Sequence, residues 1–422
     1  TGGGTLTNKS IINLTTSSSK YIWGNSILNN EGTINLIAGN LNIYQGTVNN
    51  LATGIIDLQV ADGNIGYTGG TVHLLNNTGI IKRTTTTGIA TILAELRNNN
   101  GTLSVETGTL NLQNALIKLN DGIYNVASGA ALNWMETVTC LGTLTGSLEG
   151  DLNWVGHVKI LENTLAIFNF SGSKGINWAS NYLTGGGTLT NKSIINLTTS
   201  SNKVILLNSI LNNEGTINIT AGNLDIYQGT VNNLATGIID LQVADGNIGY
   251  TGGTLHLLNN FGIIRRSSSS GSALILVETT NSGIIEIRQG TLDFSACLFL
   301  NNTADGIIQG VGNIFIPPTN KFTNNGTFAP GLSPGILTVA GNFKSSTTSK
   351  LKVELDGLIQ GTQYDVLAIQ GNAILDGNVE VIMGFEGNIN DEFIVATTTG
   401  SITQCNLAPT AISIFGNQQY NF

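Results

Sequence analysis

Residues 29–36 read Asn-Asn-Glu-Gly-Thr-Ile-Asn-Leu, and after the glycine every second residue is apolar. This two-residue period is that of a β-strand, in which successive side chains point to opposite faces. The phrase returns with substitutions, and most intervals between neighbouring copies fall in the twenties. Its further copies begin at Asn49, Asn76, Asn98, Asn212, Asn232, Asn259, Asn281 and Asn324. An interval of that length is typical of one coil of a β-solenoid.

The corners between these short strands carry Asn-Gly, Asp-Gly, Gly-Asn and Gly-Gly, which tolerate the positive φ that a sharp turn requires. Such strands can wind into a three-sided coil with Ile, Leu and Val inside. Each coil would then hydrogen-bond in parallel to the next at about 4.8 Å. We therefore predict an all-β fold, a right-handed parallel β-helix (β-solenoid). The paired asparagines at matching corners should stack into amide ladders.

A second, longer repeat encloses the first. Residues 1–14 return unchanged as residues 184–197, and residues 1–83 differ from residues 184–266 at ten positions. The predicted domains are a β-solenoid module over residues 1–183, a second over residues 184–327 and a β-rich capping segment over residues 328–422. An enzyme with one active site has no evident need for such duplication, whereas a chain that presents one surface repeatedly does.

Composition narrows the function classes. Only 10% of residues are charged and the net charge is −9, so nucleic acid is not an expected partner because no basic cluster could neutralise phosphates. No apolar run approaches the roughly 18 residues of a membrane-spanning segment. Residue 1 opens inside a repeat phrase, and we interpret the chain as a fragment of a longer repetitive protein.

The sequence around four side chains, one cysteine and three tryptophans, predicts that they lie in the interior. Cys297 aligns with Ala115 of the first module, which predicts a buried apolar role. Trp134, Trp154 and Trp178 stand in strand-like phrases and are expected to fill the core or its corners.

The end of the chain resembles a known group of proteins. Residues 329–337 read Ala-Pro-Gly-Leu-Ser-Pro-Gly-Ile-Leu, and residues 361–367 and 373–377 follow as Gly-Thr-Gln-Tyr-Asp-Val-Leu and Ala-Ile-Leu-Asp-Gly. These phrases look like the end of β-helical bacterial surface proteins, including autotransporter-like passengers and the large repeat adhesins of Bacteroidota-type bacteria. The resemblance implies an extracellular, secreted or cell-surface location. It also implies that Cys405 is a half-disulfide, paired with a cysteine beyond Phe422.

Parallel β-helices also host enzymes that cleave polysaccharides, and such sites need clustered carboxylates. The candidates are Asp57, Asp62 and His73 in the first module, with Asp240, Asp245 and His256 in the second. The sequence favours turn dipeptides for Asp62-Gly63 and Asp245-Gly246, and for His73 it favours a solvent-facing strand position over a general base. Neither a calcium repeat nor a zinc spacing is present, so no metal and no cofactor are expected.

Two functions remain open. The first is a non-enzymatic adhesin or stalk that makes many weak contacts with surfaces, cells, glycans or proteins. The second is a polysaccharide-binding or polysaccharide-degrading β-helix. Sparse charges and 6% aromatic residues favour the first.

Overall fold

The computed structural model describes residues 2–66, 73–85, 87–250, 252–267, 271–409, 413–416 and 418–420. These ranges contain strands and turns but no helix, and therefore no helix that could cross a membrane. The chain forms two compact units, residues 1–211 and residues 212–422, and the short strand β27 (Ile210–Asn213) contains the division. The sequence-based boundaries at 183/184 and 327/328 follow the repeat pattern and stay a prediction.

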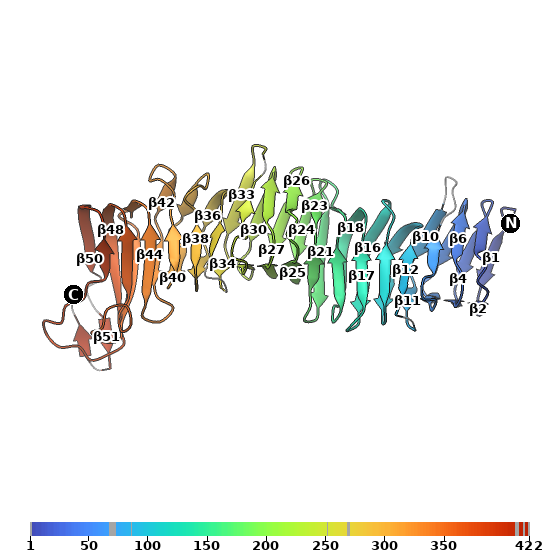
Figure 1. Ribbon diagram of the computed structural model, residues 1–422, viewed down its shortest axis with the longest axis horizontal. Helices are drawn as coiled ribbons and strands as arrows, with labels where there is room; N and C mark the ends of the chain where they lie inside the picture. Colours follow the sequence, from blue (N-terminus) through green and yellow to red (C-terminus); the bar gives the residue numbers. More distant parts are fainter. Residues whose placement is uncertain are drawn as a thin grey trace. The chain divides into compact units, whose positions relative to one another are not determined.

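In the first unit the strands stack in three parallel columns (Figure 1), which confirms the predicted parallel β-solenoid. The first column holds β1 (Thr5–Asn8), β4 (Ile27–Asn30), β7 (Gly46–Asn50), β10 (His73–Asn77), β13 (Glu95–Asn99), the first parts of β16 (Ile117–Val126) and β18 (Val138–Ser147), β20 (Val158–Lys159), β23 (Asn181–Thr184) and β26 (Lys203–Leu206).

The second column of this unit holds β2 (Ile11–Leu14), β5 (Thr33–Leu36), β8 (Ile55–Leu58), β11 (Ile80–Arg83), β14 (Thr102–Val105), the second parts of β16 and β18, β21 (Leu165–Ser171) and β24 (Thr188–Asn191). The third column holds β3 (Lys20–Trp23), β6 (Leu41–Tyr44), β9 (Asn64–Gly66), β12 (Ile89–Ile92), β15 (Thr109–Leu112), β17 (Ala131–Trp134), β19 (Asp151–Trp154), β22 (Ile176–Trp178) and β25 (Ile194–Leu197).

The long repeat does not return to the same column of the first unit. Residues 5–8 and 188–191 have the same sequence, yet β1 lies in the first column and β24 lies in the second, against β21. The intervening strands β16 and β18 run through the corner between the first and second columns, where most coils turn sharply. Equivalent strands of the two copies therefore occupy different sides of this solenoid.

The second unit repeats the three-column plan. Its first column holds β30 (Gly229–Asn233), β33 (His256–Asn260), β36 (Glu278–Asn281), β39 (Leu300–Asn302) and β42 (Phe322–Asn324). Its second holds β28 (Thr216–Ile219), β31 (Ile238–Leu241), β34 (Ile263–Arg266), β37 (Ile284–Ile287), β40 (Ile307–Gly310), β43 (Thr327–Pro330) and β46 (Lys350–Leu355). Its third holds β29 (Leu224–Tyr227), β32 (Ile248–Gly249), β35 (Ser272–Leu274), β38 (Thr291–Asp293), β41 (Asn313–Phe315), β44 (Ile336–Ala340), β47 (Val366–Gln370) and β49 (Ala396–Thr398).

The C-terminal segment is rich in β-strands, as predicted. β45 (Phe343–Lys344) and β46 both pair in parallel with β48 (Ala373–Met383), which pairs with β50 (Ile402–Pro409), so parallel stacking continues into this segment. β51 (Ser413–Phe415) and β52 (Gln418–Tyr420) then form an antiparallel pair. Tyr420 packs against a small apolar cluster that includes Leu355, Tyr364 and Met383, which ties this pair to the last coils.

The predicted amide ladders are present. In the first unit one buried asparagine of each of these coils donates its side-chain amide to the next asparagine along the column: Asn8 to Asn30, Asn30 to Asn50, Asn50 to Asn77 and Asn77 to Asn98, at 2.6–2.8 Å. The phenolic oxygen of Tyr124 accepts the amide of Asn98 at 3.0 Å and ends this ladder. In the second unit the ladder joins Asn213, Asn233, Asn260, Asn281, Asn302 and Asn324.

The buried aromatic residues stack in register. Trp134, Trp154 and Trp178 occupy one row of the third column in the first unit, and the rings of Trp154 and Trp178 are parallel with centroids 4.0 Å apart. All three side chains are buried, and so is Cys297 in the second unit, which confirms their predicted interior positions.

Candidate binding pocket

The carboxylate of Asp57 is buried and fully engaged. The hydroxyl of Thr84 lies 3.0 Å from both carboxylate oxygens, and the amide of Gln59 donates to one of them at 3.0 Å. The ammonium group of Lys82, on the neighbouring strand, lies 3.7 Å away. Through these contacts Asp57 links β8, β11 and the turn after β11.

The equivalent carboxylate in the second unit has a different neighbourhood. Asp240 is also buried and accepts a hydrogen bond from Gln242 at 3.2 Å. Arg265 stands opposite Asp240 in the register of β31 and β34, but its guanidinium donates to Glu286 at 2.7 Å instead. The two copies therefore share a carboxylate and a cation. Lys82 pairs with the carboxylate on the preceding strand of its column, whereas Arg265 pairs with a carboxylate on the following strand.

The remaining predicted residues do not join these carboxylates in a cleft. Asp62 and Asp245 are exposed and lie in turns, as their Asp-Gly sequences indicate. His73 is half-buried on β10, in the first column of its unit, whereas Asp57 is on β8 in the second column. His256, on β33, is buried between the carbonyl oxygens of Ile226 and Gly253, at 2.8 Å and 3.1 Å from its ring nitrogens.

No group of three or more His, Cys, Asp or Glu among the described residues could hold a metal ion. Cys405 is exposed and is a free thiol in this structure. Its pairing with a cysteine beyond the printed sequence stays a prediction.

A charged triad of Arg265, Glu286 and Arg288 is found in the second copy alone, and Glu286 and Arg288 line one wall of a pocket. Glu286 accepts hydrogen bonds from the Nε atoms of Arg265 and Arg288, at 2.7 Å and 2.8 Å, and from the amide of Gln309 at 3.3 Å. Burial opposes the ionisation of Glu286, but the hydrogen bonds from Arg288 and Arg265 outweigh it, so the pKa of this carboxyl lies below its usual value. Glu286 is therefore an ionised, structurally held group.

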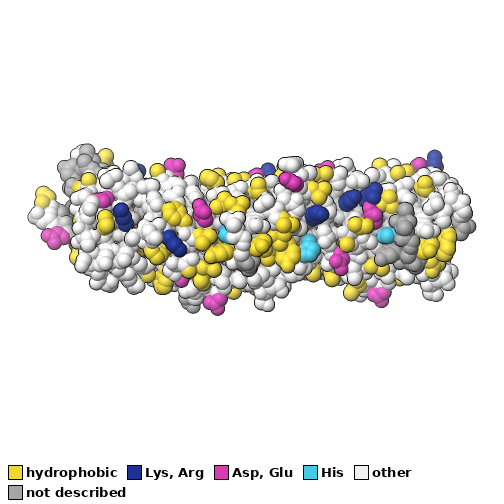
Figure 2. Space-filling view, turned by 90° about the horizontal axis from the view of Figure 1, so that it is seen from above, with side chains coloured by type: hydrophobic (Ala, Val, Ile, Leu, Met, Phe, Trp, Pro, Cys, Tyr) yellow, Lys and Arg dark blue, Asp and Glu magenta, His cyan; other side chains and the backbone are white. Residues whose placement is uncertain are grey.

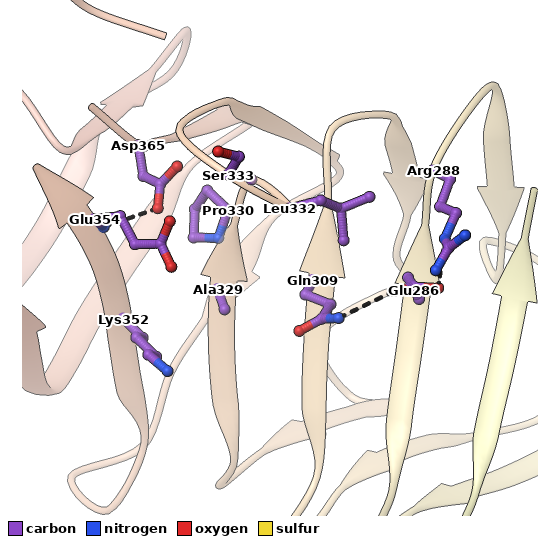
Figure 3. A pocket seen from close by; sticks show the side chains of 11 residues that line it. Glu286, Arg288, Gln309, Ala329, Pro330, Leu332, Ser333, Lys352, Glu354 and Asp365 are labelled. Carbon is purple, nitrogen blue, oxygen red and sulfur yellow. Dashed lines mark hydrogen bonds and ion pairs between the residues drawn. The ribbon is translucent and has the colours of Figure 1, made fainter. Parts of the chain in front are cut away.

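The pocket opens where this wall meets a residue with a short side chain. Glu286, Gln309 and Ala329 are consecutive outward positions of β37, β40 and β43. On the next strand Leu351 stands opposite Phe328, which places Lys352 beside Ala329. Ala329 leaves a hollow of about 440 Å³ between Gln309 and Lys352, and the loop with Leu332 and Ser333 passes above it (Figure 3). This volume lies within the range of about 300–1,000 Å³ typical of ligand pockets.

The loop over the pocket is fixed by a buried carboxylate. Asp365 accepts the backbone N–H of Gly335 through Oδ1 and that of Glu354 through Oδ2, each at 2.8 Å. Gly331 has φ +88°, and a Cβ there would lie 2.3 Å from Oδ1 of Asp365, so this turn requires glycine. Burial raises the pKa of Asp365 to about 6, and the two backbone hydrogen bonds oppose that rise.

Lys352 and Glu354 bring opposite charges to the other wall. Both are outward-facing, half-buried residues of β46, two positions apart. Figure 3 shows the ammonium group of Lys352 and the carboxylate of Glu354 on the side of their strand that faces Ala329 and Pro330. Within the part of the chain that the structure describes, neither side chain forms an ion pair or a side-chain hydrogen bond, so both are available to a ligand.

Sequence reasoning did not find this pocket. Its walls come from four neighbouring strands that are 20 or more residues apart in the sequence, and the decisive feature is the small side chain of Ala329 between larger ones. The alternation Lys-Leu-Lys-Val-Glu-Leu over residues 350–355 was a usable signal, because it indicates a charged outer face of a strand.

Comparison with known proteins supports an adhesin-like β-helix protein. A stretch of 152 residues is 28% identical to Adhesin AWP1 of the yeast Candida glabrata. The match covers 36% of this chain and 17% of the yeast protein, so the chain corresponds to a small part of that relative. No protein-family model matches the chain. The resemblance to bacterial autotransporter-like proteins stays a prediction.

Proposed function

We propose that this chain is part of a non-enzymatic adhesin that acts outside the cell or at its surface. The observation that carries the proposal is the similarity to a yeast adhesin in a chain that repeats one β-solenoid module. The partners would be surfaces, cells, glycans or proteins, and each contact would be weak. Repetition raises the overall affinity of such contacts without any single strong site.

The outer faces of both units suit this role. Outward asparagines form their own ladders, from Asn49 to Asn29 and from Asn76 to Asn49 in the first unit, each at 2.8 Å. Asn259 and Asn232 form the equivalent pair in the second unit at 2.9 Å. Parallel stacking spaces such amides by about 4.8 Å, and each would offer polar groups at a regular interval to a repetitive partner. Figure 2 shows charged side chains scattered among uncharged ones on the visible face, which favours polar over strongly ionic contacts.

Two observations support a non-catalytic role for the residues first suspected of chemistry. Asp57 is saturated by Thr84, Gln59 and Lys82, and a general base needs a free oxygen within reach of a substrate proton. Asp57 and His73 also belong to different columns.

A polysaccharide-binding β-helix is the second candidate, and the pocket around Ala329 favours it. The adhesin would attach to cells, whereas the polysaccharide binder would attach to immobilised polysaccharides and not to cells, so one set of measurements separates them. A polysaccharide-degrading enzyme would release new reducing ends from its substrate.

The test coats beads with the purified chain and measures their attachment to yeast, bacterial and mammalian cells and to immobilised polysaccharides. Albumin-coated beads are the control. We expect attachment above the control, and a steep rise with surface density of the chain because the contacts are multivalent. Attachment equal to the albumin control on every surface would refute the adhesin. Release of reducing ends from any of the polysaccharides would refute the non-enzymatic role.

A further inference from the structure

We propose that the pocket between Gln309 and Lys352 binds one residue of a neutral, polyhydroxylated glycan. The proposal deepens the adhesin function, on which it rests, by naming the ligand class and the place where it binds. Three features of the pocket carry it: a free donor beside a free acceptor, a balance of charge, and an apolar floor.

The first feature is the pairing of Lys352 with Glu354. An ammonium group only donates hydrogen bonds and a carboxylate only accepts them. A hydroxyl group does both, so two neighbouring hydroxyls of a sugar can accept from Lys352 and donate to Glu354. Bonds to charged groups are the stronger kind of hydrogen bond, which suits a small site that must hold a well-hydrated ligand.

The second feature is that the charges of the pocket nearly cancel. Among the residues that line the pocket, Arg288 and Lys352 carry two positive charges and Glu286 carries one negative charge. Glu354 and Asp365, when ionised, contribute two negative charges on the same side as Lys352. An anionic ligand close to Lys352 would meet the carboxylate of Glu354 on the same strand face, and a cationic ligand close to Glu354 would meet Lys352. A neutral ligand meets neither repulsion.

The third feature is the apolar surface between the walls. Ala329 and Pro330 line the pocket, and Leu332 above them is 45% exposed. The ring of a sugar presents C–H groups on its faces and hydroxyls at its edge. Its face could cover this apolar surface while its edge reaches Lys352 and Glu354, an arrangement common in ligand pockets that combine apolar walls with a few polar groups.

The first copy of the repeat provides an internal comparison. Ser104 and Glu106 stand where the second copy has Glu286 and Arg288. Lys82, the counterpart of Arg265, is paired with Asp57. The double variant E286S/R288E therefore replaces two residues of the pocket wall with those of the first copy. K82A is the control, because it removes the first-copy counterpart of Arg265 and leaves the pocket unchanged.

The experiment measures binding by ligand-observed NMR and calorimetry on the full chain. The probes are cello-, laminari-, manno- and galacto-trioses as neutral glycans and trigalacturonic acid as the anionic comparator. We expect at least one neutral trisaccharide to bind with a dissociation constant in the millimolar to high micromolar range. K352A and E354Q should each weaken that binding about tenfold or more, E286S/R288E should weaken it as well, and K82A should leave it unchanged. Thermal unfolding of each variant checks that the fold is retained.

The outcomes separate the two proposals. Binding of trigalacturonic acid alone, binding that K352A and E354Q do not weaken, or no binding of any neutral trisaccharide up to about 10 mM would each overturn the glycan pocket. If the beads still attach to cells in that case, the adhesin stands and its contacts lie elsewhere. If the beads attach to nothing while the neutral glycan binds at the pocket, the adhesin fails and the binding site remains.

Discussion

The buried amide ladder makes the sharpest prediction, at Asn260. This side chain is fully buried in the second unit. Its carbonyl oxygen accepts from Asn233 at 2.8 Å, and its amide donates to Asn281 at 2.7 Å and to the backbone oxygen of Ile284 at 3.1 Å. Asn260→Ala removes all three hydrogen bonds and leaves the buried carbonyl of Asn281 without this donor.

The expected loss follows from those contacts. Each bond contributes about 0.5–1.5 kcal/mol net, and a buried group left without a partner adds about 1–3 kcal/mol. We therefore expect Asn260→Ala to lower local stability by about 3–5 kcal/mol. The adjacent Asn259 is a matched control, because it is half-buried and donates a single ladder bond, to Asn232 at 2.9 Å. Asn259→Ala should lower stability by less than about 1 kcal/mol, since water can replace that bond.

Hydrogen exchange measured by mass spectrometry is the suitable assay. Repeat proteins open in segments, and all four tryptophans lie in the first unit, at positions 23, 134, 154 and 178, so their fluorescence does not report on β33. The slowest amides of β33 and β36 should exchange far faster in Asn260→Ala than in Asn259→Ala. Equal protection of the two variants, within about 0.5 kcal/mol, would refute the reasoning that the buried ladder holds the coils together.

Three further predictions concern other buried or exposed groups. Arg266 is fully buried, and its guanidinium donates to four backbone oxygens, those of residues 241, 243, 244 and 271. Arg266→Met should therefore destabilise the second unit by about 3–5 kcal/mol, measured by denaturant unfolding followed by circular dichroism. A loss below about 1 kcal/mol would contradict this prediction. Asp365 has a folded-state pKa raised to about 6, so its contribution to stability is fully present below its unfolded pKa of about 3.9 and is lost as pH rises through 6. Relative to Asp365→Asn, the wild type should therefore lose about 2 kcal/mol between pH 4 and 7, and parallel stability–pH curves would show that the carboxyl does not titrate in this range. Cys405 is exposed, whereas burial raises the pKa of the Cys140 and Cys297 thiols. Iodoacetamide at pH 8 should therefore label Cys405 alone among the cysteines of the folded chain. If mass mapping finds Cys140 or Cys297 labelled to the same extent, their assignment as buried thiols is wrong.

Much of the fold could be read from particular residues. The alternation in residues 29–36 identified strands, and the recurring Asn-Asn pair identified both the coil length and the ladders, since 20 residues separate Asn30 from Asn50 and 27 separate Asn50 from Asn77. The turn character of Asp62 and Asp245 was equally visible. The candidate site was not, because the sequence offers Asp57, Asp62 and His73 as candidates in one module, whereas the structure places Asp57 and His73 in different columns.

The sequence by itself determined that this chain would coil into stacked parallel strands, because a short apolar period and glycine-rich corners act locally and repeat in every coil. Only the tertiary structure decided which column each strand occupies and which side chains of neighbouring coils meet. In the first unit β1 and β24 have identical sequences but lie in different columns, because the 183 residues between equivalent positions do not form a whole number of three-column coils. In the second unit Glu286 turns Arg265 away from Asp240, and Ala329 opens a pocket beside Lys352. These outcomes depend on which residues of neighbouring coils lie opposite each other. That pairing depends on the length and course of every preceding coil, which no short stretch of sequence contains.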